Sequence, residues 1–153
     1  MKDSFIQPTI YEINTPVFLH EVSRRAGRVI TFADVPDSEW DAIARPGIDT
    51  VWFMGVWKRS LVARQMAKKE AWLQLALPDI RDEDLIGSAY SIQDYVVESS
   101  FGGNEGLASA RAKLSQRGIK IMLDYVPNHV GIDHAWTTQH PDYFLVGTEQ
   151  ELA

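Results

Sequence analysis

The sequence predicts an α/β fold in which parallel strands alternate with helices. Three short runs rich in apolar and β-branched residues have the character of strands, and they occupy residues 11–19, 48–54 and 119–123. Segments with helical character separate these runs, and the connections are too long for hairpins. We therefore expect the three strands to be parallel neighbours, in chain order, in one curved sheet.

The first strand and the first helix are predicted from short local signals. Residues 11–19 include Tyr11, Ile13, Val17 and Phe18, and Pro16 should mark an edge or the end of this strand. Residues 37–44 begin with acidic residues and carry apolar side chains at helical spacing, which favours a helix that ends before Pro46-Gly47.

The remaining elements complete the alternation. Residues 48–54 form a dense apolar run between two glycines, which is typical of a strand buried on both faces. Residues 61–77 have a helical composition, and Pro78 ends this segment. Residues 79–88, which are rich in acidic side chains, are predicted to form a loop. Asn104 is predicted to cap a helix with a buried stripe that ends at Arg117-Gly118, directly before the strand at 119–123; the stripe consists of Leu107, Ala110 and Leu114.

Composition excludes several classes of protein. The formal net charge of -6 leaves no basic surface for phosphates, so nucleic acid is not an expected partner. No apolar run is long enough to span a bilayer, and residues 1–9 lack the apolar core of a signal peptide. We therefore expect no membrane association and a cytoplasmic location. The chain has no cysteine, which excludes disulfides and thiolate metal sites.

One segment combines polar side chains with the end of a predicted strand. Asp124 follows the apolar run 119–123, and Asn128 and His129 come in the loop after it. In (β/α)8 barrels the active site is built at the carboxyl ends of the strands, where side chains from several strands converge. Residues 124–129 are therefore the candidate functional segment.

The sequence Asp124-Tyr-Val-Pro-Asn-His129 is similar to the first conserved region of the α-amylase family, glycoside hydrolase family 13. Residues 87–95 resemble that family's tyrosine-bearing loop, residues 101–120 the helix leading to its third strand, and residues 47–52 its second strand. The resemblance runs from about Tyr11 to Phe144. It implies that the chain is the N-terminal part of a (β/α)8 TIM barrel, with about three strands, and that residues 1–153 form one incomplete catalytic barrel with a long connection between strands two and three.

The resemblance also implies roles for individual residues. Asp124 would belong to the hydrogen-bonded network around the nucleophile without being the nucleophile itself. Tyr90 would stack on the sugar, and His129 would bind a sugar hydroxyl. Asn128 offers its amide oxygen to a structural Ca²⁺ in many members of the family, and no other cofactor is implied.

Each of these residues also has an ordinary structural explanation. His129 or Asn128 alone would more often be a loop or turn residue, Tyr90 a packing residue and Asp124 a loop cap. Their joint occurrence in the family's order favours the functional interpretation. We assign no role to His134 and His140. The tryptophans Trp52, Trp57 and Trp72 are expected to be buried rather than to bind sugar, and the acidic residues 79–84 to be a solvated loop rather than a Ca²⁺ site.

Retaining glycosidases need a nucleophile and a general acid, and none of the four acidic residues after Asp124 lies in a segment resembling the family's later motifs. The resemblance implies a parent enzyme that hydrolyses or transfers α-glucosidic bonds in an α-glucan, an oligosaccharide or a sucrose-like substrate. We expect the chain alone to be inactive and to fold poorly, with Val51, Phe53, Ile121 and Leu123 partly wet.

The sequence also allows two alternatives to an enzyme fragment. The first is a non-catalytic carbohydrate-binding or transport-associated module on the same fold. The second is an open α/β nucleotide binder, which is disfavoured because the sequence has neither G-x-G-x-x-G nor G-x-x-x-x-G-K-[ST].

Overall fold

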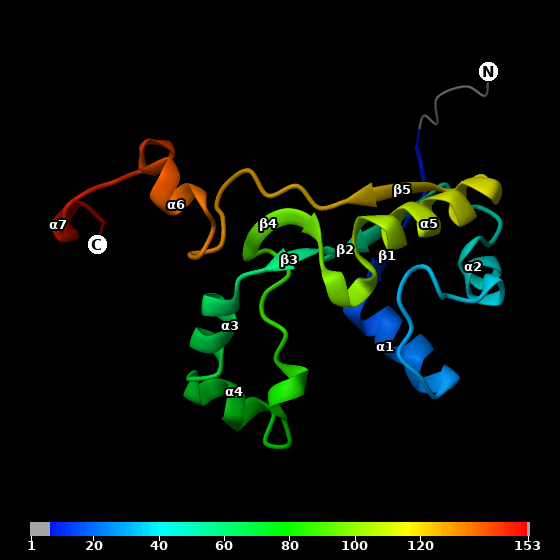
Figure 1. Ribbon diagram of the computed structural model, residues 1–153, viewed down its shortest axis with the longest axis horizontal. Helices are drawn as coiled ribbons and strands as arrows, with labels where there is room; N and C mark the ends of the chain where they lie inside the picture. The colour runs from blue at the N-terminus through cyan, green and yellow to red at the C-terminus, as the bar shows by residue number, and fades with distance from the viewer. Residues whose placement is uncertain (1–6, 153) are drawn as a thin grey trace. The chain divides into compact units, whose positions relative to one another are not determined.

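The computed structural model describes residues 7–152, which divide into two compact units (Figure 1). The first unit contains the residues up to Lys58 together with Tyr95–Val126, and the second contains Arg59–Asp94 and the residues from Pro127 onward. The chain passes from one unit to the other within strands β3 (Trp57–Arg59) and β4 (Ile92–Val97), which pair as a two-stranded sheet. These two short strands were not predicted.

The first unit is built on a parallel sheet of three strands, β1 (Ile10–Asn14), β2 (Thr50–Met54) and β5 (Lys120–Leu123). Their order is β1-β2-β5, and both pairs are parallel. The prediction of three parallel neighbours in chain order is therefore confirmed.

The prediction of a strand over residues 11–19 is wrong in its second half. The strand β1 ends at Asn14, and helix α1 (Thr15–Ala26) follows at once. Pro16 lies in the first turn of the helix, where its missing N–H costs nothing, and Asn14 Oδ1 accepts the Val17 amide at 3.5 Å as an N-cap. The capping residue and the proline outweighed the β propensity of Val17 and Phe18.

Two further helices agree with the sequence. Helix α2 (Asp37–Ile43) has the predicted acidic first turn, and helix α5 (Gly103–Gln116) buries the predicted stripe. The predicted cap is wrong, however. Gly102, with a φ of 100°, is the N-cap of α5, whereas Asn104 Oδ1 accepts the Val97 amide at 3.1 Å and so ties the helix to β4.

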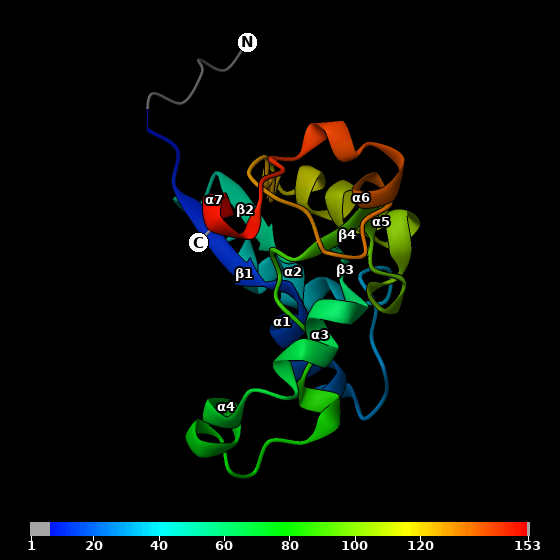
Figure 2. The same cartoon turned by 90° about the vertical axis from the view of Figure 1, so that its left-hand side faces the viewer.

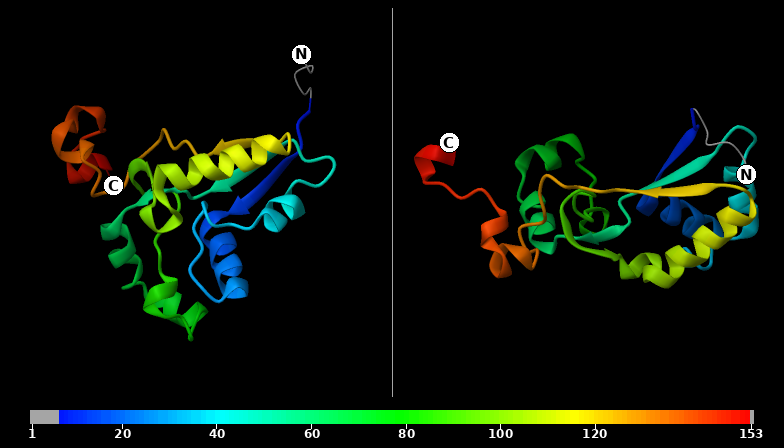
Figure 3. Two further views of the ribbon diagram at one scale, coloured as in Figure 1. Left: turned by 45° about the vertical axis from the view of Figure 1, so that its right-hand side comes forward. Right: turned by 90° about the horizontal axis from the view of Figure 1, so that it is seen from above.

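Helices α1, α2 and α5 cover one face of the sheet, and the core lies beneath them (Figure 3). Val51 and Phe53 of β2 are fully buried there, and the Phe53 ring lies edge-on to Trp40 of α2 at 6.3 Å. Ile121 and Leu123 are partly buried and pack against the same core. The expectation that these side chains stay partly wet is therefore wrong for Val51 and Phe53, which are fully buried under the helices, whereas Ile121 and Leu123 remain partly exposed.

The opposite face of the sheet is the open one. Because side chains alternate along a strand, the registers place Glu12, Trp52 and Met122 in one row across this face, and Met122 is 41% exposed. The polar Glu12 and Asn14 of β1 are also exposed. The apolar face of this sheet is thus covered by helices, and the more polar face is open.

The second unit is mostly short helices and loops, of which α3 (Leu61–Ala67) and α4 (Ala71–Ala76) are visible as separate helices in Figure 2. The remaining elements are η1 (Asp82–Asp84), α6 (Trp136–Gln139), η3 (Pro141–Tyr143) and α7 (Glu149–Leu152).

The predicted single helix over residues 61–77 is broken after Ala67. The side chains at the break are engaged elsewhere: Lys68 Nζ contacts Asp82 at 2.6 Å, and Arg64 donates to the backbone carbonyls of Asp82 and Leu85. Tertiary contacts with residues 82–85 therefore overrode the helical composition of this segment. Among the helices of residues 7–152, none is long and apolar enough to cross a membrane.

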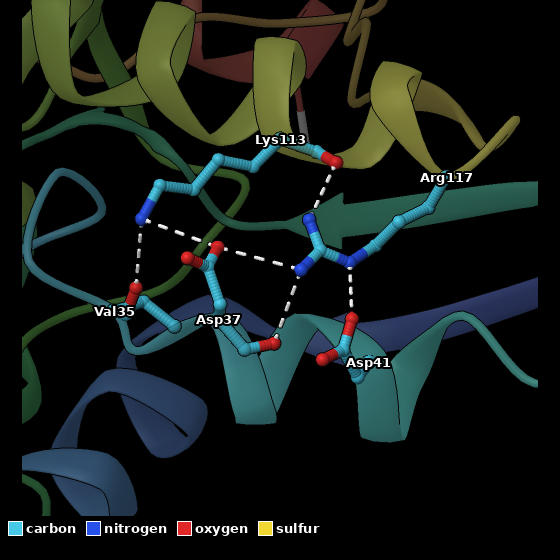
Figure 4. A network of polar contacts seen from close by, with 5 residues as sticks. All are labelled: Val35, Asp37, Asp41, Lys113 and Arg117. Carbon is cyan, nitrogen blue, oxygen red and sulfur yellow. Dashed lines mark hydrogen bonds and ion pairs between the residues drawn. The ribbon is translucent and has the colours of Figure 1, made fainter.

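A charged network joins α2 to α5 (Figure 4). Arg117 Nε contacts Asp41 Oδ1 at 2.6 Å, its Nη2 contacts Asp37 Oδ1 at 3.4 Å, and Lys113 Nζ donates to the Val35 carbonyl at 3.2 Å. Arg117 therefore bridges two helices that are far apart in the sequence.

We expect Arg117→Met to lower the urea midpoint of unfolding modestly, and the difference from the wild type to shrink as salt is added, because partly exposed ion pairs are screened. The matched control is Arg24→Met, since among the described residues Arg24 forms its ion pair with Glu21 of its own helix. Equal midpoint changes in the two variants would contradict a role for Arg117 in joining the helices.

Candidate functional site

Asp124 directly follows strand β5 in the first unit, and its carboxylate is held by two donors. Trp52 Nε1 donates to Oδ1 at 2.9 Å, and the Gly55 amide donates to Oδ2 at 2.5 Å. The side chain is buried. A buried carboxylate needs such hydrogen-bond donors. Asp124 therefore links the end of β5 to β2 and to the loop after it.

The backbone after Asp124 is fixed as well. Trp57 Nε1 donates to the Asp124 carbonyl at 2.8 Å. The Tyr95 hydroxyl accepts the Val126 amide at 2.9 Å and donates to the Val126 carbonyl at 3.2 Å. The Trp57 and Tyr95 rings meet edge to face at 5.3 Å, so the whole segment 124–126 rests on aromatic side chains.

Sequence reasoning missed the partners of Asp124. It expected Trp52 and Trp57 to be buried, and both are only half-buried, with their indole N–H groups bonded to Asp124. Trp72, expected to be buried, is instead 63% exposed. The requirement that a buried indole N–H find an acceptor was the available signal, but it could not identify which acceptor.

Tyr90 and His129 come together in the second unit, as two of the predicted sugar-binding residues. His129 Nε2 lies 3.1 Å from the Tyr90 carbonyl oxygen, and His129 Nδ1 lies 3.4 Å from Asn128 Nδ2. A carbonyl can only accept, so this pattern assigns the proton to Nε2 and leaves Nδ1 as an acceptor. Both side chains are exposed, with Tyr90 at 42%.

Asn128, the predicted Ca²⁺ ligand, lies exposed beside His129. Ca²⁺ takes six to eight oxygen ligands. Within residues 7–152 no group of three or more acidic or histidine side chains could hold a metal, and the Asn128 amide nitrogen faces His129. The role of Asn128 as a Ca²⁺ ligand therefore remains a prediction, and no chemical step below depends on it.

The loop that carries His129 is anchored to the rest of the second unit. The Gly131 amide donates to the Ile92 carbonyl at 2.6 Å, and a Cβ at position 131 would lie 2.9 Å from both Ile92 O and Ser60 Cβ. Asp133 Oδ2 accepts the Leu61 amide at 3.1 Å and the Val62 amide at 3.4 Å, at the start of α3. The loop therefore depends on a glycine and on a helix cap.

Asp133 gives this anchor a pH dependence. Burial acts to raise the pKa of Asp133, but hydrogen bonds from the Ser60 hydroxyl and from backbone amides outweigh it, so the pKa lies below the usual aspartate range. A depressed carboxyl pKa contributes stability that is fully present above the unfolded pKa and is lost as the pH falls through the folded one.

We therefore expect Asp133→Asn to destabilise the chain by about 1 kcal/mol at neutral pH, the usual value of a helix cap, with a smaller difference in acid. Urea unfolding at a series of pH values measures this. The difference would stay constant with pH if the Asp133 charge played no part.

Asp124 belongs to the first unit, whereas Tyr90 and His129 belong to the second. The structure brings the His129 ring to the Tyr90 backbone carbonyl, and it describes Asp124 with its own partners. That the Tyr90 and His129 rings lie close together remains a prediction. That all three open onto one concave face remains a prediction.

Comparison with known proteins supplies the family. The model of the α-amylase catalytic domain matches residues 40–151. Maltase 1 of Drosophila virilis is 36% identical over 61 residues, which are 39% of this chain and 10% of the relative. Oligo-1,6-glucosidase of Heyndrickxia coagulans is 40% identical over 50 residues, or 32% of this chain and 9% of the relative.

A relative of another kind also matches. The amino acid transporter heavy chain SLC3A1 of Homo sapiens is 26% identical over 113 residues, which are 69% of this chain and 13% of the relative. The matched segments thus span about a tenth of the length of these curated relatives.

Solved structures agree on the fold. An α-amylase from Lactobacillus plantarum aligns with 93% of this chain at a TM-score of 0.65 and 23% identity, and the alignment covers 28% of that enzyme. An α-amylase from Geobacillus thermoleovorans, complexed with acarbose, aligns with 93% of this chain at a TM-score of 0.54 and 22% identity, again over 28% of its length. The parallel strands β1-β2-β5 and the covering helices therefore correspond to part of a (β/α)8 barrel. With the family model matching most of its length, the chain belongs to the α-amylase family of glycoside hydrolases.

Proposed function

We propose that this chain is the part of a glycosidase catalytic domain that positions the sugar. The whole domain hydrolyses or transfers α-glucosidic bonds by a retaining mechanism. The observation that carries the proposal is the Asp124 carboxylate, buried at the end of a barrel strand and fixed by Trp52 and Gly55. Burying a carboxylate costs free energy. Its burial at the carboxyl end of a barrel strand, where active sites are built, therefore favours a role in the active site.

Asp124 acts in a supporting network and not as the nucleophile. A nucleophilic carboxylate must present a free oxygen to the anomeric carbon. Both oxygens of Asp124 already accept hydrogen bonds from the chain itself. The group is therefore suited to holding a fixed negative charge beside the reacting groups.

His129 and Tyr90 bind the sugar. His129 Nδ1 is the freer ring nitrogen, because its contact with Asn128 is long at 3.4 Å, so a sugar hydroxyl can donate to it. The exposed Tyr90 ring offers an apolar face to the C–H face of a pyranose. The Tyr90 carbonyl meanwhile keeps the His129 ring in place.

The 153 residues alone do not supply the nucleophile and the general acid. Of the four acidic residues after Asp124, Asp133 caps α3, and Glu151 accepts the amide and the hydroxyl of Thr148. Asp142 lies in η3 and Glu149 is the first residue of α7, both in the second unit. We expect no measurable hydrolysis by these residues, because losing one member of a catalytic unit already costs several powers of ten in rate.

The substrate class is proposed from the relatives. A maltase and an oligo-1,6-glucosidase are among them, and one structural neighbour was solved with acarbose. An α-glucan or an α-linked glucooligosaccharide is therefore the substrate we favour, and a sucrose-like sugar belongs to the same chemical class.

A non-catalytic, transport-associated module is the second candidate. The match to a human amino acid transporter heavy chain over 69% of this chain favours it, since that relative is named for transport and not for hydrolysis. This candidate predicts that the Tyr90 and His129 region has no affinity for sugar.

The test is a titration of the isotope-labelled chain with acarbose, followed by amide NMR. We expect weak, millimolar binding with shifts centred on Tyr90 and His129, and their loss in His129→Ala. Cellobiose, a β-linked disaccharide, is the control and should cause no shift. Absence of shifts at Tyr90 and His129 would favour the transport-associated module. Hydrolysis of maltose by the wild type that Asp124→Ala abolishes would contradict the proposed lack of a nucleophile and acid.

A further inference from the structure

Four aromatic rings form a connected cluster in the segment that follows the His129 loop. His134 and Trp136 meet at 4.9 Å, Trp136 and Tyr143 at 5.6 Å, and His140 stacks on Tyr143 at 4.7 Å with only 8° between the planes. We call these four residues the aromatic platform. All of them lie in the second unit, and none has a role in the function proposed above.

The platform is held by short-range hydrogen bonds. The buried His134 accepts the Trp136 amide on Nδ1 at 3.1 Å, and its carbonyl accepts the Thr137 hydroxyl at 2.7 Å. The His140 amide then donates to the Trp136 carbonyl, and the Tyr143 amide donates to the His140 carbonyl. Successive turns therefore fix the rings before any ligand arrives, which lowers the entropy cost of binding.

The two largest rings of the platform remain open to solvent. Trp136 is 45% exposed and Tyr143 is 60% exposed, although each touches another ring. Packing of the short helix α6 does not require this exposure, because the buried His134 already anchors it. Exposed large aromatic surface beside imidazole groups suits a ligand that has both apolar faces and hydroxyl groups.

Trp72 provides a contrast within the same unit. It is 63% exposed on α4, and in the described part of the chain its indole meets no other ring. An exposed tryptophan therefore does not by itself mark a site here. The platform differs because its rings are multiple, in contact and fixed by hydrogen bonds.

We propose that the aromatic platform is a second carbohydrate-binding surface, separate from Tyr90 and His129, on which Trp136 and Tyr143 stack against the glucose rings of an α-glucan chain. His140 holds the Tyr143 ring and offers hydrogen bonds to the sugar hydroxyls. The choice of an α-glucan as ligand rests on the proposed function. The existence of the surface rests on the ring geometry alone.

Affinity electrophoresis of the 153-residue chain tests the proposal, with soluble amylose in the native gel and a gel without polysaccharide as reference. We expect amylose to retard the wild type, and Trp136→Ala and Tyr143→Ala to weaken the apparent affinity roughly tenfold or more. Trp136→Phe should keep part of the retardation. The matched control is Trp72→Ala, which removes an equally exposed indole and should run as the wild type, and hydroxyethylcellulose should retard none of the proteins.

Several outcomes would overturn the platform. These are a wild type that amylose does not retard, a Trp136→Ala protein retarded as strongly as the wild type, or an equal loss in Trp72→Ala. An amide NMR spectrum that matches the wild type shows that a variant is folded. If Trp136→Ala does not fold, Trp136→Phe still tests the role of the indole. Retardation by amylose without acarbose shifts at Tyr90 and His129 would contradict the proposed function and support the platform. Acarbose shifts at Tyr90 and His129 without retardation by amylose would support the proposed function and contradict the platform.

Discussion

Phe53→Ala should destabilise the chain by about 3–5 kcal/mol, the largest effect we expect from a single substitution. Phe53 is fully buried between the sheet and the helices, where its ring meets Phe32 at 5.1 Å and Trp40 at 6.3 Å. Removing the ring leaves a cavity that three helices and a sheet cannot all collapse into. Urea unfolding followed by tryptophan fluorescence measures the change, and Phe53→Leu should cost less.

The control is Met122→Ala, on the open face of the same sheet. Met122 is 41% exposed, so we expect a change of about 0.5 kcal/mol or less. The pair of variants therefore tests which face of the sheet the helices cover. A larger loss in Met122→Ala than in Phe53→Ala would mean that the covered face has been assigned the wrong way round. The same unfolding curves test the expectation that the chain folds poorly as a monomer, because a non-cooperative transition in the wild type would support it.

Asp124→Ala should be the second most damaging substitution, at roughly 2–4 kcal/mol. It removes the acceptor for the Trp52 indole N–H and for the Gly55 amide, and each donor left unsatisfied in a buried position costs about 1–3 kcal/mol. The indole of Trp52 also provides the readout, because its fluorescence should change when its hydrogen bond is lost. Unfolding free energy and emission maximum are measured on the same samples.

Asp124→Asn separates the loss of charge from the loss of shape. The amide oxygen can still accept one hydrogen bond, whereas its NH2 group faces the second donor, so we expect an intermediate loss of stability. Asp142→Ala is the surface control, because Asp142 lies exposed in η3. An Asp124→Ala protein as stable as the wild type would contradict the view that this carboxylate links the end of β5 to the loop after β2.

The sequence alone predicted the features that depend on local signals. The parallel strands β2 and β5, the acidic start of α2 and the stripe Leu107, Ala110 and Leu114 of α5 all follow from patterns within a few residues. The segment Asp124-Tyr-Val-Pro-Asn-His129 likewise indicated the family from its sequence alone. Where two local signals competed, as at Asn14 and Pro16, helix capping won over β propensity, and the choice could not be weighed from composition.

Only the tertiary structure decided which residues meet. Trp52 and Asp124 are 72 residues apart, and Asp133 caps a helix that begins 72 residues before it. The break after Ala67 depends on residues 82–85, and the burial of Phe53 depends on which face of β2 the helices cover. A buried donor requires an acceptor, and an apolar face requires burial against another element. The sequence predicts these requirements but not which residues meet them. The packing of segments distant in the sequence decides which residues become partners, because the free energy of folding depends on contacts between them.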